Sequence, residues 1–157
     1  MGRCERAVML GPADGEQFEI IGGGVRVLLD GKASGGQCCV LEIPVTPGDG
    51  PPLHTHERED ELFYILEGRV KFALNGETFV AERGAFVCAP RGSVHTFKNI
   101  GATEARMIVT CTPAGIEHVF RAIAKPRPGS AGTGQTQEQV VAALGAHGIT
   151  FKGPPLA

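Results

Sequence analysis

The chain has 157 residues, a net charge of −2 at pH 7 and a hydrophobic fraction of 42%, which predicts one domain with a real core and excludes global disorder. Its 23 glycines and 11 prolines follow no three-residue period, so the chain is expected to turn often and is not collagen-like. A sequence pI of about 6.2 argues against a nucleic acid or a membrane surface as partner, because neither polyanion would attract the chain over distance.

The N-terminal segment and the cysteines indicate the cellular compartment in which we expect the protein. No apolar stretch approaches the roughly 20 residues of a membrane span, and charges interrupt residues 1–20, so we expect neither a membrane partner nor a signal peptide. The five cysteines are an odd number and lack Cys-x-x-Cys spacing. We therefore expect reduced thiols in a cytoplasmic protein.

Short apolar runs separated by turn residues occupy most of the segment 18–111. The clearest runs are 62–66, 70–74, 78–81 and 85–89. Asn75-Gly76, between the second and third runs, is typical of a type I′ hairpin, in which both central residues adopt positive φ. Short strands about eight residues apart are typical of an all-β sandwich or barrel.

Two helices are predicted after Pro113. The first has apolar residues at the helical period, namely Ile116, Val119, Phe120 and Ile123. The second begins with a capping box of Thr136 and Gln139 and has a short apolar face and a C-terminal glycine, formed by Val140, Val141, Leu144 and Gly148. The Gly- and Pro-rich segment 125–134 predicts a flexible loop. We therefore divide the chain into a β-barrel over residues 1–112 and a helical extension over 113–157 that packs on it.

His54, His56 and Glu61 are the first residues with chemical content. In a strand, residues two apart point to one face, so both imidazoles can reach one ion. Glu61 shares its face with Phe63 and Ile65, which directs its carboxylate inward. A buried carboxylate without a partner is strongly disfavoured, and a cation would supply one. Most of the acidic segment 57–60 is interpreted as a solvated loop.

The remaining histidines divide into two kinds. His95 shares its face with Phe97 and is expected to look inward. His118 and His147 lie in the predicted helices without ligand spacing, so we interpret them as surface or helix-end residues.

Two glycine-framed motifs contain these candidates. The first, over residues 48–68, runs Gly48-x5-His54-x-His56-x4-Glu61-x6-Gly68; the second, over residues 84–99, runs Gly84-x5-Pro90-x-Gly92-x2-His95-x3-Asn99. They resemble the two motifs of the cupin superfamily. Two short segments of the tail, 112–120 and 148–156, are similar to the end of small single-domain cupins of the quercetin-dioxygenase-like group. The resemblance implies a jelly-roll barrel, or double-stranded β-helix, with one divalent metal held by His54, His56, Glu61 and His95.

Three imidazoles and one carboxylate suit iron, manganese, nickel, cobalt, copper or zinc, and ligand type does not choose among them. On an octahedral ion they leave two positions open, which permits a substrate oxygen and dioxygen, or both arms of a chelating substrate, to bind together. Strand alternation assigns six side chains to the walls of a substrate pocket, namely Phe63, Ile65, Phe72, Phe86, Cys88 and Phe97. None of them carries a charge, which favours an apolar or aromatic molecule.

These features favour a metal-dependent dioxygenase that acts on a small apolar or aromatic enol or phenol. The resemblance to quercetin dioxygenases implies that Glu61 is the base that removes the substrate's proton. The alternatives are a metal-dependent isomerase, cyclase or lyase, and a non-catalytic small-molecule-binding cupin. The apolar outer face of Leu62, Tyr64 and Leu66 favours a homodimer, and the loop 125–134 is a candidate lid.

Overall fold

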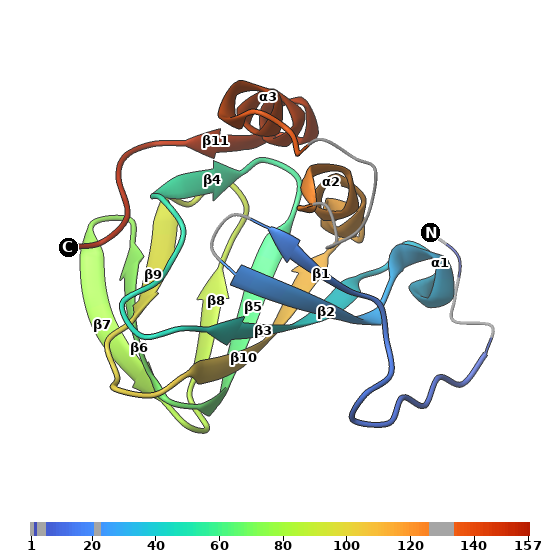
Figure 1. Ribbon diagram of the computed structural model, residues 1–157, viewed down its shortest axis with the longest axis horizontal. Coiled ribbons are helices and arrows are strands. Elements are labelled where there is room, and N and C mark those ends of the chain that lie inside the picture. Colours follow the sequence, from blue (N-terminus) through green and yellow to red (C-terminus); the bar gives the residue numbers. More distant parts are fainter. Residues whose placement is uncertain (1, 3–5, 21–22, 126–133) are drawn as a thin grey trace.

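Two antiparallel sheets face one another in the computed structural model, which describes residues 2, 6–20, 23–125 and 134–157 (Figure 1). The six-stranded sheet has the order β1-β2-β3-β10-β5-β8, and the five-stranded sheet has the order β11-β4-β9-β6-β7. The strands of the two sheets are β1 (Gln17–Ile20), β2 (Gly23–Leu29), β3 (Cys39–Val45), β4 (His54–His56), β5 (Asp60–Glu67), β6 (Arg69–Leu74), β7 (Glu77–Glu82), β8 (Phe86–Ala89), β9 (His95–Asn99), β10 (Ala105–Thr112) and β11 (Ile149–Phe151). The helices are α1 (Gly31–Ser34), α2 (Ile116–Ile123) and α3 (Gln137–His147). The predicted all-β jelly roll with two short C-terminal helices is confirmed.

Glycines set the tight turns between the strands. Asn75 and Gly76 join β6 to β7 with φ angles of 49° and 88°, as the two-residue hairpin requires. Gly68, between β5 and β6, has a φ of 92°, and a Cβ there would lie 2.5 Å from the Cβ of Ala105. Only glycine fits this turn, which explains its place at the end of the first motif.

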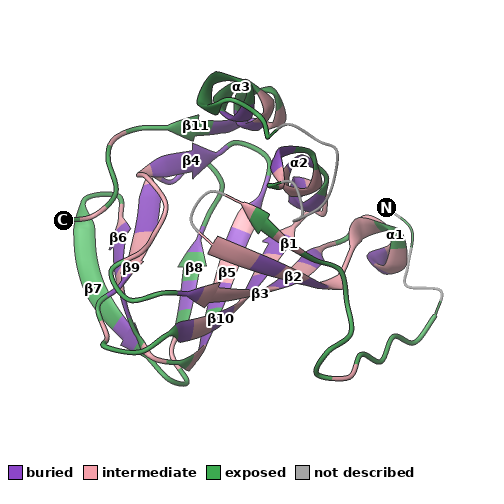
Figure 2. Cartoon of the chain, in the orientation of Figure 1, coloured by how far each residue is buried: buried purple, intermediate pink, exposed green. Residues whose placement is uncertain are grey.

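The core lies between the inner faces of the two sheets (Figure 2). Along β10 the buried positions alternate strictly with half-buried ones, the period expected of a strand with one face in the core. Phe63 of β5 and Phe72 of β6 contact each other across the barrel at a centroid distance of 5.2 Å. Burial of each large side chain contributes about 1.5–3 kcal/mol, so these inner faces hold the sheets together.

Both C-terminal helices form over the predicted residues. Ile116, Val119 and Ile123 of α2 join the core. Thr136 makes the predicted capping box with Gln139, and Gly148 ends α3 in the left-handed conformation. The apolar face of α3 is narrower than expected, because Val141 lies 100° round the helix from Val140 and is 43% exposed.

The tail also contributes a strand that the sequence did not reveal. β11 pairs antiparallel with β4, with Ile149 opposite His56 and Phe151 opposite His54. In Figure 1, α3 and β11 lie side by side over β4. β11 therefore extends the five-stranded sheet, and α3 packs against β11.

Two further expectations concern mobility and membranes. The predicted loop 125–134, with its proposed lid function, falls on residues 126–133, outside the described residues. Within the described part of the chain, no helix has the length and apolar character needed to cross a membrane.

Candidate metal centre

The four candidate ligands come together between the two sheets. His54 and His56 lie on β4, Glu61 begins the inward face of β5, and His95 begins β9. Their ligand atoms all lie within 4.8 Å of one another, and all four residues are buried. His54 pairs directly with His95 across the sheet, and β5 of the opposite sheet supplies the carboxylate. The structure thus brings together the four residues that the two motifs contain.

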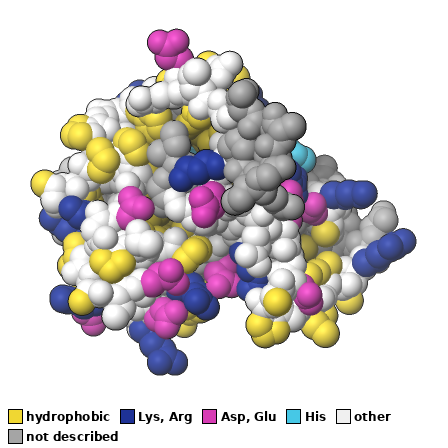
Figure 3. All heavy atoms as spheres, viewed as in Figure 1, with side chains coloured by type: hydrophobic (Ala, Val, Ile, Leu, Met, Phe, Trp, Pro, Cys, Tyr) yellow, Lys and Arg dark blue, Asp and Glu magenta, His cyan; other side chains and the backbone are white. Residues whose placement is uncertain are grey.

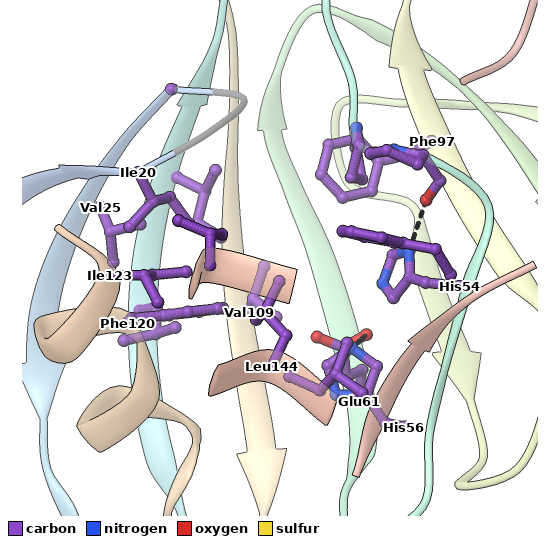
Figure 4. A pocket seen from close by; sticks show the side chains of 18 of the residues that line it. Ile20, Val25, His54, His56, Glu61, Phe97, Val109, Phe120, Ile123 and Leu144 are labelled. Atoms are coloured by element: carbon purple, nitrogen blue, oxygen red, sulfur yellow. Dashed lines mark hydrogen bonds and ion pairs between the residues drawn. The ribbon is translucent and has the colours of Figure 1, made fainter. Parts of the chain in front are cut away.

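Backbone carbonyls orient two of the imidazole rings. Nδ1 of His54 lies 2.7 Å from the carbonyl oxygen of Pro52, and Nδ1 of His95 lies 3.2 Å from that of Ser93. Because a carbonyl only accepts, each Nδ1 donates its proton there, and each Nε2 is left to face the site. Figure 4 shows the first of these bonds, with His54, His56 and Glu61 at one side of the cavity.

The Glu61 carboxylate is the electrostatic centre of this group. Its Oε2 lies 2.6 Å from Nε2 of His95 and 3.4 Å from Nε2 of His56. Burial alone would raise the pKa of Glu61, but the neighbouring imidazoles lower it to about 2. Burial lowers the pKa of His54 to about 4. At neutral pH the carboxylate is therefore ionised and His54 is neutral, which are the states that metal ligation requires.

Cys111 of β10 contacts the second oxygen of Glu61 without being a ligand. Its Sγ lies 3.7 Å from Oε1 of Glu61. A hydrogen bond with Cys39 and burial raise the pKa of the Cys111 thiol, so the sulfur stays protonated and acts as a weak donor. The donor set is therefore three imidazoles and one carboxylate, which fits a divalent transition metal. The only sequence signal for Cys111 as a site residue is its inward parity on β10.

An apolar cavity of about 120 Å³ opens onto the candidate ligands. Its walls come from both sheets, both C-terminal helices and β11, as Figure 4 shows in part. The lining residues are Ile20, Gly23, Gly24, Val25, Leu41, Ile43, Pro51, Pro52, His54, His56, Glu61, Phe63, Phe97, Val109, Phe120, Ile123, Val140, Leu144, Ile149 and Phe151. Apart from the candidate ligands, no described residue of this lining is ionisable.

The structure places the six predicted wall residues in three different environments. Phe63 and Phe97 line the cavity, whereas Ile65 and Phe72 are buried in the core and do not reach it. The inward placement of Phe86 and Cys88 is wrong, since Phe86 is 60% exposed and Cys88 is exposed. Their neighbours Val87 and Ala89 point inward, opposite Phe63 and Glu61 of β5. Both faces of this strand are apolar, so alternation alone did not show which face is buried.

The interpretation of two polar residues also needs correction. Glu59, placed in a solvated loop, is 1% exposed, and its Oε1 contacts Nε2 of His147. His147, interpreted as an ordinary helix-end residue, therefore reaches a buried carboxylate near the candidate ligands. His118 is exposed on α2, as expected. No sequence signal links Glu59 to His147, because 88 residues separate them.

Comparison with known proteins agrees with the fold and the motifs. Residues 42–111 match the family model described as "Cupin domain". The chain is 32% identical over 93 residues to the polyketide synthase protein CurC of Streptomyces cyaneus, covering 59% of this chain and 60% of CurC. It is 22% identical over 118 residues to quercetin 2,3-dioxygenase of Bacillus subtilis (strain 168), covering 75% of this chain and 35% of that enzyme.

A solved structure shows the same fold. The polyketide cyclase RemF of Streptomyces resistomycificus superimposes with a TM-score of 0.60 at 24% identity, over 68% of this chain and 80% of RemF. The chain spans less than two thirds of the length of either curated relative named above. The matched segment contains all four candidate ligands and both motifs. The segment 42–111 is therefore similar to a cupin domain, and the barrel has the cupin fold.

Proposed function

We propose that this chain is a metal-dependent enzyme acting on a small apolar or aromatic enol or phenol. The observation that carries the proposal is the apolar cavity that ends at His54, His56 and Glu61. Its walls would strand a phosphate or a charged sugar without a partner, whereas they would pack against a ring or a hydrocarbon chain. A substrate held there presents its polar atom to the one polar end of the cavity.

The chain's residues have distinct roles in this proposal. His54, His56, Glu61 and His95 would hold a divalent transition metal, which when bound acts as a Lewis acid toward a substrate hydroxyl. The apolar walls exclude water from the reacting group. Glu61 accepts the hydroxyl proton on Oε1, because Oε2 faces Nε2 of His95 and of His56 at the site that would hold the metal, whereas Oε1 faces the weak thiol donor of Cys111.

We propose dioxygenation as the reaction, supported by the relative named quercetin 2,3-dioxygenase, whose match extends over 75% of this chain. A metal-dependent cyclisation is the second candidate, favoured by the higher identity of 32% to a polyketide synthase protein. The two reactions differ in one measurable respect, since only the first consumes dioxygen.

The experiment begins with elemental analysis of the purified protein and continues with paired assays in air and under nitrogen. The substrates are flavonols, 1,3-diketones and catechols, with oxygen uptake and substrate loss recorded together. Coupled uptake supports the dioxygenase, and loss of substrate without uptake supports the cyclase. Tight binding of these compounds without turnover under any metal would replace both with a binding protein.

The first prediction concerns Glu61→Gln, which keeps the side-chain shape but removes the proton acceptor. We expect kcat to fall about 10²- to 10⁴-fold, the usual contribution of a general base. Glu57→Gln, which changes an exposed carboxylate of the same loop, is the matched control and should keep wild-type kcat. Turnover of the Glu61 variant at the wild-type rate would remove the proposed base.

A further inference from the structure

His56 is oriented differently from the other two imidazoles of the metal centre. His54 and His95 each turn Nδ1 toward a backbone carbonyl two residues earlier. Nδ1 of His56 instead lies 3.5 Å from Oε2 of Glu59, and neither atom has a hydrogen-bond partner within the described structure. A side chain, rather than the local backbone, faces the outer nitrogen of this ring.

Glu59 is itself held from the C-terminal helix. Its other oxygen contacts Nε2 of His147, the last residue of α3. The side chain of Glu59 is 2% exposed and that of His147 is 14% exposed, so the contact is shielded from water. A buried carboxylate is strongly disfavoured unless its oxygens are engaged, and here one oxygen faces each histidine.

The backbone that follows α3 also contacts the segment that carries His56 and Glu59. Directly after His147, Gly148 ends α3 with a φ of 96° and Ile149 pairs with His56 in the sheet. The carbonyl of Gly148 also accepts a hydrogen bond from the N–H of Glu57 at 2.9 Å. The tail thus contacts both the backbone of His56 and, through Glu59, the outer face of its imidazole.

We propose that Glu59 and His147 form a positioning pair that orients His56 for metal binding, so that the C-terminal segment helps to assemble the metal centre. The proposal rests on the proposed metal site and adds two residues that do not contact the metal. The His56 ring can turn about its side-chain bonds unless Nδ1 has a fixed partner. Carboxylates opposite the outer nitrogen of a ligating histidine fix ring orientation, and their loss weakens metal affinity by about 10- to 100-fold.

The main experiment compares Glu59→Gln with Glu57→Gln. Each variant removes one negative charge from the same loop, but only Glu59 faces His56. The dissociation constant for Co²⁺ is measured by competition with a chelator of known affinity, and thermal unfolding of the metal-free proteins checks that both fold. We expect the dissociation constant to be about 10- to 100-fold larger for Glu59→Gln and to keep its wild-type value for Glu57→Gln.

His147 provides the second variant, so that the test does not depend on Glu59→Gln folding. His147→Ala removes the contact and should weaken Co²⁺ binding, whereas His147→Gln keeps a donor for Glu59 and should restore most of the affinity. His118→Ala is the control, because His118 is exposed on α2. The visible spectrum of bound Co²⁺ gives a further readout, since a turned imidazole alters the ligand field and a purely structural role does not.

Reciprocal coupling offers a test on the tail itself. If His147 contributes to metal affinity through Glu59, metal must stabilise the docking of α3 and β11 by the same factor. Hydrogen exchange of residues 137–151 should therefore slow on Co²⁺ addition in the wild type and slow less in His147→Ala. Unchanged affinity, spectrum and exchange in the His147 and Glu59 variants would overturn the positioning role, whereas a wild-type protein that binds no metal would overturn the proposed function instead.

Discussion

Single side chains decide whether the proposed metal centre can load. His54 and His95 present Nε2 to the site because Nδ1 of each donates to a carbonyl, so neither can be replaced without losing an oriented donor. We predict that His54→Ala and His95→Ala lose bound metal, as measured by elemental analysis of the purified variants. His118→Ala, which alters an exposed histidine, should keep the wild-type metal content.

Acid should release the metal, because a protonated imidazole cannot bind a cation. Burial opposes a charge on His56, but the Glu61 and Glu59 carboxylates outweigh it and raise the pKa above its ordinary value of 6.5. Burial lowers the pKa of His54 to about 4. As pH falls from 7 to 4, protons therefore compete for His56 before they compete for His54. Dialysis at stepped pH followed by elemental analysis should show falling metal content, and constant content down to pH 4 would contradict the ligand set.

The ion pair of Asp60 and Arg91 links the start of β5 to the turn before β9. Arg91 donates to Asp60 from its backbone and its guanidinium, which lowers the pKa of Asp60 from 3.8 to about 2. A lowered carboxylate pKa adds stability above pH 3.8, and that stability is lost as pH falls through 2. We predict that Arg91→Ala lowers the melting temperature slightly at pH 7 and that the difference from wild type disappears near pH 2. A difference that grows toward low pH would contradict this assignment.

At the scale of the elements, glycine is required at two positions for different physical reasons, a close backbone contact at one and a positive φ at the other. A Cβ on Gly50, just before β4, would lie 1.9 Å from the carbonyl oxygen of Phe97 in β9, whereas Gly76 has a φ of 88° and open space around it. We predict that Gly50→Ala costs about 3 kcal/mol or more through the clash, and that Gly76→Ala costs only about 1–2 kcal/mol of backbone strain. Urea unfolding of both variants measures the difference, and equal losses would contradict it.

The strands show where sequence patterns are informative. Glu61 could be placed inside because Phe63 and Ile65 share its face, although Leu62, Tyr64 and Leu66 make the opposite face of the strand apolar as well. The same alternation failed for Phe86 and Cys88, since Val87 and Ala89 are also apolar and only the pairing with β5 selects the buried face. Helices α2 and α3 could be predicted over their full lengths because their periodicity and caps are local. β11 could not, because three residues carry no period and the strand exists only through its pairing with β4.

The candidate site likewise has parts that could be predicted from the sequence and parts that could not. Both motifs are local in sequence, so the four candidate ligands could be identified before the fold was known. The cavity walls from α2, α3 and β11 could not, because their contact with the barrel depends on tertiary packing. Glu59 was hidden among exposed acidic neighbours, and its partner His147 lies 88 residues away.

At the level of the whole molecule, the outer surface bears on assembly. On the face in Figure 3, acidic and basic side chains are interspersed, in keeping with the small net charge of −2. Tyr64 and Phe86 lie opposite each other on β5 and β8 and are 46% and 60% exposed. Because β8 is an edge strand of its sheet, this apolar pair is the place where the predicted homodimer would form.

Light scattering coupled to size exclusion measures this prediction directly. We expect the mass of a dimer for the wild type and that of a monomer for Phe86→Glu, which places a charge in the apolar pair. Val141→Glu is the control, because Val141 is 43% exposed and lies on α3 rather than on β5 or β8. A monomeric wild type would end the homodimer prediction.

The pairing of β11 with β4 also imposes an order on biosynthesis. All four candidate ligands have been synthesised once the ribosome passes residue 95, but part of the cavity wall comes from Phe120, Leu144 and Phe151. A released chain that ends at residue 112 would lack this part of the wall and would leave the apolar residues that line the cavity open to solvent on that side. Synthesis of α3 and β11 adds this wall, so the C-terminal segment completes the apolar lining beside the candidate ligands.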